Sequence, residues 1–315
     1  MSPAKQIKQK ALELGFDLAG ITDASPIDGR QVRFFREWLD GGFAGQMAYM
    51  HRNFEKRINP GELLADAKSV IVTGLNYKPA QIKSQPPCPD VPMGEIAAYA
   101  QYEDYHVFIK KQLGSLVEFI ASNVDGEHEF KICVDSAPLA ERALAARAGL
   151  GFIGRNHMLI HPQLGPQILL GEIVTTLKLA ADKPIEQNCS NCNQCIAACP
   201  TGALGADGRF DANKCISYLT IEYRDEIPPQ LAGKIGDRLF GCDACVLACP
   251  YCESGPVCGN GDFKYHGERE RLELEKLLNL EQERFDEDFA DSPLKRTGLE
   301  KLKRNAKNCL KNIKT

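Results

Sequence analysis

The segments CSNCNQCIAACP at residues 189–200 and CDACVLACP at residues 242–250 contain seven of the thirteen cysteines in this 315-residue chain. The first has the spacing Cys-x2-Cys-x2-Cys-x3-Cys-Pro, and the second has the spacing Cys-x2-Cys-x3-Cys-Pro. The surrounding residues 181–262 contain too few apolar side chains to form a core of their own. We therefore expect bound metal to stabilise this part of the chain, which makes the two motifs decisive for the fold.

The spacing is typical of proteins with two 4Fe–4S clusters, in which the cysteine before proline ligates the other cluster. The second motif lacks its leading cysteine, and Cys215 lies upstream, where it can take that place. The spacing therefore predicts one cluster on Cys189, Cys192, Cys195 and Cys249, and a second on Cys199, Cys215, Cys242 and Cys245.

Structural zinc is the alternative, because paired Cys-x2-Cys units also form tetrahedral thiolate sites. Zinc needs only two such pairs, and it would leave Cys195 and the two Cys-Pro endings without a role. Cys252 and Cys258 remain possible substitutes for one of the predicted cluster ligands.

Composition excludes several classes of protein. A hydrophobic content of 43% and a charged content of 25% are those of a globular chain, and the length favours about two domains. The net charge of −4 means that any nucleic-acid binding must come from a local basic patch. No apolar run reaches the ~18 residues of a membrane span, and the N-terminus lacks the apolar core of a signal peptide. An odd number of cysteines without such a signal indicates a reducing cytoplasm.

The sequence divides into three parts. Residues 1–180 read as an α/β domain, with strands expected at 18–22, 69–75, 130–134 and 168–177 and helices at 5–14, 104–122 and 136–148. Residues 181–262 form the ferredoxin-like cluster module, and residues 263–315 form a charged tail that is basic from Lys295 to Lys314. Residues 78–94 contain five prolines and are expected to form a loop.

Asp135 is the candidate catalytic residue of the α/β domain. It follows an expected strand and precedes the helix expected at 136–148, a position at which α/β folds often bind ligands. Asp135 or Ser136 could also simply cap that helix. The GxGxxG pattern that starts at Gly149 follows a helix instead of opening one, so it does not indicate a dinucleotide site.

The chain resembles the epoxyqueuosine reductases. The matching stretches are residues 38–50 (WLDGGFAGQMAYM), 56–77, 104–106 (DYH), 134–160, 170–177, both cysteine motifs, 215–224 (CISYLTIEYR) and 292–306 (SPLKRTGLEKLKRNA). The resemblance implies reduction of epoxyqueuosine to queuosine at the wobble position of a tRNA, by two-electron removal of the epoxide oxygen. It also implies that the α/β domain binds cobalamin as reductive dehalogenases do, and that an external low-potential donor reduces a monomeric enzyme.

The resemblance also assigns residues. Asp135 corresponds to the family's acid. Cobalamin contacts are implied at Arg57, Tyr105, His106, Asp135, Arg142, Arg155, Asn156, His157, Leu159, Leu170 and Ser217. tRNA contacts are implied at Arg224, Lys295, Arg296, Lys301, Lys303 and Arg304.

Two features depart from the family pattern. Many members continue into a C-terminal helical domain of HEAT type, which this chain lacks, and some carry a cysteine before the DYH triplet, which is absent from residues 94–106. A cobalamin-dependent reductase of small molecules and an electron-carrier subunit are the alternative functions.

The expected position of Asp135 creates a conflict between structure and chemistry. A helix N-terminus lowers the pKa of a carboxyl group, whereas a general acid at neutral pH needs a raised pKa. We therefore expect Asp135 to be protonated only in the substrate complex.

Overall fold

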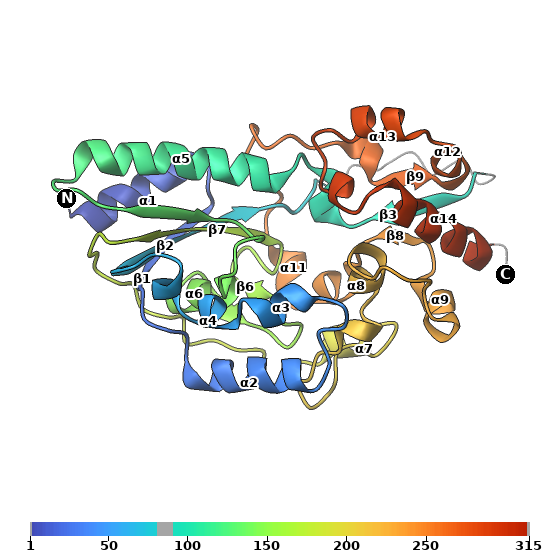
Figure 1. The fold of residues 1–315 in the computed structure, drawn as a ribbon, viewed down its shortest axis with the longest axis horizontal. Helices are drawn as coiled ribbons and strands as arrows, with labels where there is room; N and C mark the ends of the chain where they lie inside the picture. The colour runs from blue at the N-terminus through green and yellow to red at the C-terminus, as the bar shows by residue number, and fades with distance from the viewer. Residues whose placement is uncertain (1, 81–90, 314–315) are drawn as a thin grey trace.

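The computed structural model describes residues 2–80 and 91–313. Its central sheet contains β1 (Leu18–Asp23), β2 (Ser69–Asn76), β4 (Phe130–Cys133) and β7 (Ile168–Thr175) in the order β1-β2-β7-β4 (Figure 1). All four strands coincide with apolar runs in the sequence, which confirms the strand predictions. Each neighbouring pair is antiparallel, so the rule that parallel strands bind ligands at their carboxyl ends does not apply to this sheet.

Helices cover both faces of the central sheet (Figure 1). Successive side chains of a strand point to opposite faces, so Ile71 and Ile173 pack against α1 (Pro3–Glu13) and α5 (Tyr105–Asn123). Val72 and Val174 belong to a separate hydrophobic cluster with Leu144 and Ala145 of α6 (Glu141–Arg147). Glu172, in the middle of β7, is fully buried on this second face.

The helix expected at 136–148 begins five residues later than predicted, at Glu141. Pro138 disfavours a helical conformation at the residue before it, and the Ala140 N–H donates to the carbonyl of Arg57 at 3.0 Å. Ser136 therefore caps no helix. Residues 135–140 form a loop that starts from a left-handed Asp135 with φ of 49°.

A second sheet joins the three predicted parts of the chain. It contains β3 (Met93–Ile96), β8 (Arg238–Phe240) and β9 (Arg271–Glu273) in the order β8-β3-β9, with β3 parallel to β8 and antiparallel to β9. Most of the predicted 78–94 loop lies outside the described residues, and its last two residues already belong to β3.

The shorter elements connect these layers. They are α2 (Gly29–Asp40), α3 (Ala48–Arg52), α4 (Phe54–Ile58), β5 (Phe152–Ile153), β6 (Leu159–Ile160), α7 (Gln194–Ala197), α8 (Ile216–Ile221), α9 (Pro229–Ile235), α10 (Ala244–Leu247), α11 (Pro250–Ser254), α12 (Leu274–Leu278), α13 (Gln282–Asp288) and α14 (Leu299–Ile313), with 3-10 turns at 60–62, 98–101, 212–214, 267–269 and 293–296. In the described part of the chain, no helix combines the length and apolarity needed to cross a membrane.

The segment after residue 262, expected as a charged tail, is folded. Leu302, Ala306 and Cys309 of α14 are completely buried in a core shared with Phe240 of β8 and Leu274 of α12. The division of the chain at residues 180 and 262 stays a prediction.

Arg304 shows how tightly α14 is attached. Its guanidinium donates hydrogen bonds to the carbonyls of Leu219, Tyr223 and Asp225 at 2.7, 2.9 and 2.6 Å. Only 9% of the residue is exposed. It therefore stabilises the fold and is not available for the predicted tRNA contact.

We expect Arg304→Ala to lower the free energy of unfolding by about 2–3 kcal/mol, because buried carbonyls lose a charged donor. Lys307→Ala, on the exposed side of the same helix, should change it by less than about 0.5 kcal/mol. Urea denaturation measures both values. If the two variants unfold at the same urea concentration, the hydrogen bonds of Arg304 contribute nothing to stability.

Candidate active site and cluster ligands

The fold brings the eight predicted cluster cysteines together in two sets. Burial raises the pKa of Cys249, and the thiols of Cys189 and Cys192 raise it further, although Cys249 belongs to the other motif. Burial also raises the pKa of Cys195, and the same two thiols raise it further. These four cysteines, named set 1, are therefore neighbours.

The other four cysteines form set 2. Burial raises the pKa of Cys245 to about 12, with further contributions from the thiols of Cys215, Cys242 and Cys199. The two sets are those expected from the exchange of the Cys-Pro cysteines between motifs. In the described residues, no three His, Cys, Asp or Glu side chains form a ready site for a single metal ion.

Cys252 and Cys258, the two possible substitute ligands, have other hydrogen-bond partners. Cys252 Sγ donates to Gln167 Oε1 at 3.2 Å, and Cys258 is hydrogen-bonded to the Tyr102 side chain. These bonds favour the original ligand assignment over substitution by either residue.

A cavity of about 270 Å³ lies against set 1. Arg155 and Asn156, predicted to contact cobalamin, line this cavity. The Arg155 backbone N–H donates to Cys189 Sγ at 3.4 Å, and the Asn156 side chain donates to the carbonyl of Cys245 at 3.2 Å. The turn between β5 and β6 thus contacts both sets of cysteines.

Asp135 is the outer end of a chain of three hydrogen-bonded groups. Asp104 Oδ1 caps α5 by accepting the His106 backbone N–H at 3.0 Å, and it lies 2.6 Å from His106 Nδ1. His106 Nε2 lies 3.0 Å from Asp135 Oδ2, and the Tyr105 side chain is also hydrogen-bonded to Asp135. The His106 side chain is only 9% exposed, whereas that of Asp135 is 56% exposed.

The two carboxylates determine the charge of the imidazole. Burial lowers the pKa of His106, but the hydrogen bonds to Asp104 and Asp135 outweigh it and raise the pKa above its usual value. Burial raises the pKa of Asp135, but the hydrogen bond and charge of His106, the hydrogen bond of Tyr105 and the charge of Arg296 together outweigh burial and lower it. In the free protein the proton is therefore on His106 and Asp135 is a carboxylate. The low pKa of Asp135 comes chiefly from this imidazole, with contributions from Tyr105 and Arg296, and Asp135 does not lie at the start of α6.

Arg296, predicted to bind tRNA, reaches into the same site. Its Nη1 contacts His106 Nε2, and its positive charge opposes protonation of the ring. Asp135 and Arg296 thus compete for one ring nitrogen, which donates to Asp135 when His106 is charged and accepts from Arg296 when it is neutral.

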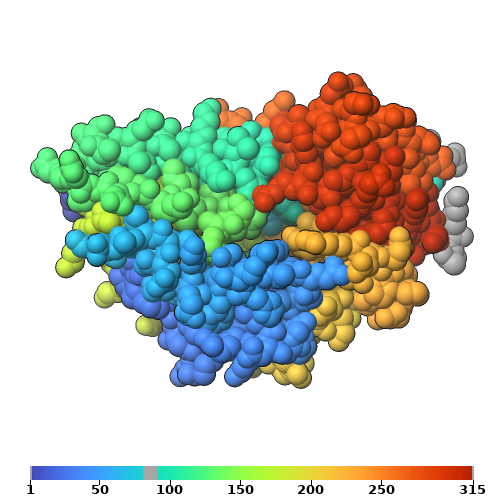
Figure 2. Space-filling view, viewed as in Figure 1, coloured from blue at the N-terminus to red at the C-terminus, as the bar shows by residue number. Residues whose placement is uncertain are grey.

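Charged and aromatic side chains surround Asp135. Burial raises the pKa of Tyr49 to about 12, with further effects from Glu222 and Asp135, although 39% of Tyr49 is exposed. Burial lowers the pKa of Arg57, and the charges of Tyr49 and Asp135 offset part of this effect, so the three side chains are neighbours. Figure 2 shows the surface hollowed where these segments, coloured blue, green and orange, meet the red C-terminal segment.

Two side-chain nitrogens of the predicted cobalamin contacts lack a hydrogen-bond partner in the described residues. Arg57 Nε and His157 Nε2 are buried without a hydrogen bond among the described residues. Arg142 Nη1 donates to the His157 carbonyl at 2.9 Å. Leu159 and Leu170 lie in the core that contains α6, so only their backbone is available to a cofactor. Ser217 is half-buried on α8, next to the set 2 thiol of Cys215.

Sequence reasoning missed Asp104 and Tyr49 as site residues. Asp104 stands at a helix start, where it reads as a cap, and Tyr49 reads as a core aromatic residue. Only the match of the DYH triplet and of residues 38–50 to a family of enzymes pointed to these segments.

Two family profiles match the chain: "4Fe-4S double cluster binding domain" over residues 188–252 and "Epoxyqueuosine reductase QueG, DUF1730" over residues 57–136. A curated epoxyqueuosine reductase from Leadbetterella byssophila is 39% identical over 96% of each chain. Another from Vibrio cholerae is 36% identical over 96% of this chain and 81% of its own length.

Solved structures give the same result. A crystal structure of epoxyqueuosine reductase with an epoxyqueuosine-modified tRNA-Tyr stem loop has a TM-score of 0.90 at 30% identity, covering 98% of this chain and 81% of that one. The Bacillus subtilis epoxyqueuosine reductase, solved with an aspartate catalytic loop swung out of the active site, has a TM-score of 0.90 at 29% identity with the same coverage.

Cys249→Ser should halve the iron content, from about eight to about four irons per chain, because it removes a ligand from set 1. Cys258→Ser, which changes a thiol bonded to Tyr102, should leave iron unchanged. Iron and sulfide analysis of anaerobically purified protein measures both. Full iron content in Cys249→Ser would contradict the exchange of cysteines between motifs.

Asp135→Asn should lower the pKa of His106, because it removes a carboxylate that stabilises the imidazolium. NMR titration of isotope-labelled histidine in the cluster-oxidised protein measures this change. Asp125→Asn, in the exposed loop after α5, is the matched control and should have no effect. An unchanged or higher pKa in Asp135→Asn would show that the two side chains are not coupled.

Proposed function

The chain belongs to the epoxyqueuosine reductase family, and on this basis we propose that it reduces epoxyqueuosine in tRNA to queuosine by removing the epoxide oxygen. The observation that carries the proposal is the Asp104–His106–Asp135 chain, which presents a carboxylate at the surface and stores a proton behind it. Removal of the oxygen as water takes two electrons and two protons. The chain can supply one of these protons.

The cluster module fits the electron requirement. It matches a double-cluster family over residues 188–252, and its eight cysteines lie in two sets. Set 1 lies in a segment with exposed residues such as Asn188, Ser190 and Asn193, and the turn between β5 and β6 of the α/β domain contacts both sets. We assign electron entry from an external low-potential donor to set 1, in a chain that works as a monomer.

The residues around Asp135 fit a cobalamin. The unpartnered nitrogens of Arg57 and His157 are donors or acceptors for polar groups on the rim of a large ring, and Phe34, 43% exposed, adds an apolar surface stacked on His157. Arg57, Arg142, His157 and Ser217 would hold the cofactor. When bound, cobalamin supplies the low-potential metal centre that delivers electrons to the substrate.

The protein's own residues handle the proton. Asp104 keeps His106 protonated, and His106 passes this proton to Asp135 when substrate oxygen becomes negatively charged. Bound tRNA excludes water from Asp135, which raises the pKa of its carboxyl group and favours the protonated form. Burial raises the pKa of Tyr105, so its hydroxyl stays neutral and holds Asp135 in place.

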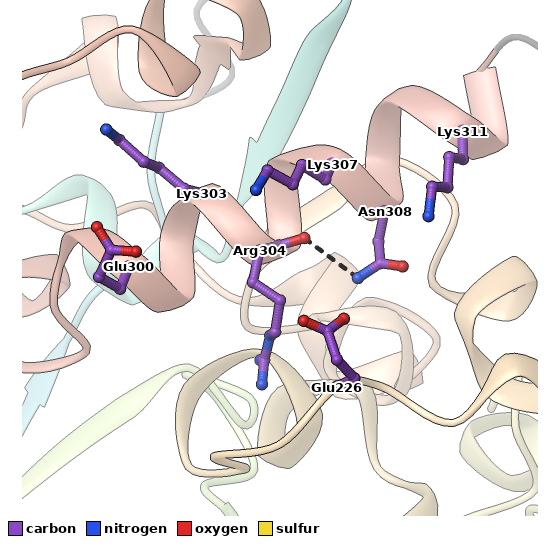
Figure 3. A pocket seen from close by; sticks show the side chains of 7 residues that line it. All are labelled: Glu226, Glu300, Lys303, Arg304, Lys307, Asn308 and Lys311. Carbon is purple, nitrogen blue, oxygen red and sulfur yellow. Dashed lines mark hydrogen bonds between the residues drawn. The ribbon is translucent and has the colours of Figure 1, made fainter.

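A pocket on α14 is the proposed surface for tRNA phosphates (Figure 3). It has a volume of about 210 Å³ and is lined by Glu226, Glu300, Lys303, Arg304, Lys307, Asn308 and Lys311. Lys303, Lys307 and Lys311 are spaced four residues apart, which places them along one face of the helix.

The other predicted tRNA contacts fall into two groups. Lys301 Nζ donates to the Ile221 carbonyl at 2.6 Å, and Arg296 contacts His106, so both are engaged within the protein, as is Arg304. Arg224 and Lys295 have exposed side chains and remain assigned to tRNA.

Asp135→Asn should lower turnover by about 10²–10⁴-fold, the usual contribution of a general acid, while retaining both clusters and cobalamin. The assay incubates the anaerobic protein with epoxyqueuosine-containing tRNA, cobalamin and a low-potential reductant, followed by nucleoside mass analysis. Asp125→Asn is the control and should match the unmodified protein. Near-normal turnover in Asp135→Asn would exclude Asp135 as the acid, and no queuosine from the unmodified protein would refute the proposed function.

Replacing Lys303 and Lys307 by Ala should weaken tRNA binding by about 0.5–2 kcal/mol. The slope of log affinity against log salt concentration should fall by the amount expected for about two lost phosphate contacts. Filter binding over a salt series measures both. The matched control replaces Lys110 and Lys111, exposed on α5, and should leave tRNA affinity unchanged. The phosphate assignment fails if the two double variants bind tRNA equally.

A further inference from the structure

The carboxyl group of Glu172 lies in an apolar environment. It is 0% exposed in the middle of β7, and it pairs with Val72 of β2 on one side and with Cys133 of β4 on the other. Directly paired strand residues point to the same face, so Glu172 faces the hydrophobic cluster beneath α6. An isolated carboxylate in such a place is strongly disfavoured, and burial therefore favours the protonated form.

Glu141, the first residue of α6, is the polar neighbour of Glu172. Their carboxyl groups lie within hydrogen-bonding reach of each other, yet no N–H or O–H of the described residues donates to either oxygen of Glu172. Two carboxylates are both acceptors, so a hydrogen bond between them requires one proton.

Glu141 also holds the loop that carries Asp135. Its Oε1 accepts the Asp135 backbone N–H at 2.5 Å. Asp135 adopts φ of 49°, a left-handed conformation that a non-glycine residue keeps only when its surroundings hold it there. The backbone of Asp135 is therefore fixed from behind by Glu141, while its side chain is fixed in front by His106.

We propose that Glu141 and Glu172 share a single proton and act together as a positioning pair that holds the Asp135 loop in its catalytic conformation. This inference rests on the proposed function, because it assigns Asp135 the role of acid. Glu172 donates its proton to Glu141, and Glu141 keeps a negative charge for the Asp135 N–H. Neither residue contacts the substrate.

The electrostatics agree with this arrangement. Burial raises the pKa of Glu141 to about 7, and the charge of Asp135 adds to the effect. Burial raises the pKa of Glu172 still further above its usual value, with Glu141 and Asp135 contributing. The other charged or titratable groups facing the pair are Arg142 on α6, Arg57 on α4, the thiol of Cys133 on β4 and the hydroxyl of Tyr105 on α5.

The pair should work over a limited pH range. Loss of the shared proton at alkaline pH leaves two buried negative charges that repel each other, so Glu141 moves away and releases the Asp135 N–H. Burial and mutual repulsion raise the pKa values of both carboxyl groups, so this loss comes at a higher pH than for an ordinary glutamate. The Asp135 side chain then keeps its hydrogen bonds to His106 and Tyr105, but its backbone N–H has lost the Glu141 acceptor.

The first test compares Glu141→Ala with Glu141→Gln in the cluster-loaded protein. Glu141→Ala removes the acceptor, so hydrogen exchange of the 134–140 backbone should become faster and kcat should fall by about 10–100-fold with an unchanged KM for tRNA. Glu141→Gln keeps an acceptor oxygen and should restore both. Equal exchange and equal kcat in all three proteins would overturn the proposal.

The second test uses Glu172→Gln, whose amide donates a hydrogen bond to Glu141 at every pH. The ratio of wild-type to Glu172→Gln kcat should be constant at low pH and fall as the shared proton of the wild type is lost. A ratio that stays constant across the alkaline range would overturn the proposal. Iron content and tRNA affinity, which the pair does not touch, confirm that each variant is folded.

The two tests separate failure of this inference from failure of the proposed function. Hydrogen exchange at residues 134–140 reports on the loop without substrate. If the wild-type protein makes no queuosine but Glu141→Ala still loosens the loop, the proposed function is wrong and the positioning pair stands. If the wild-type protein makes queuosine but Glu141→Ala does not loosen the loop, the proposed function stands and the positioning pair is wrong.

Discussion

His106 is a buried imidazole between two carboxylates, and its protonation state controls the rest of the site. Asp104 comes from the start of α5, Asp135 from the loop after β4, and Arg296 from the turn before α14, so three distant segments meet at one ring. The carboxylates favour the imidazolium and Arg296 opposes it. A small shift of any of these segments changes where the proton is held, which explains why each of them is tied to its surroundings.

The C-terminal segment provides much of that attachment. The Asp104 backbone N–H donates to the carbonyl of Asp291 at 2.6 Å, and Asp291 Oδ1 in turn accepts a hydrogen bond from Arg269 at 2.5 Å. β9 pairs with β3, only a few residues before α5 in the sequence. Residues 263–313 therefore support the N-terminal end of α5 from one side, while the central sheet supports the rest of the helix.

The sequence was sufficient for features set by local pattern. Apolar runs located the four strands of the central sheet, and cysteine spacing predicted which thiols the fold brings together. The sequence was insufficient for features that depend on tertiary contacts. The start of α6 depends on a bond from Ala140 to the Arg57 carbonyl, some eighty residues earlier in the chain. Likewise, the basic run after Lys295 gave no sign that Arg304 would be buried, because its carbonyl partners belong to a distant segment. Glu172 interrupts the apolar pattern of its strand, and the sequence alone does not indicate its role.

The exchange of cysteines between the two motifs has a consequence for biosynthesis. Each set includes at least one cysteine from the other motif's segment: Cys249 joins set 1, and Cys199 joins set 2. During translation the first motif leaves the ribosome about fifty residues before Cys249, with three of its thiols waiting for a fourth. Neither inorganic core can then be completed on a nascent chain that ends between the motifs. Maturation of the module therefore has to wait until the second motif has been synthesised.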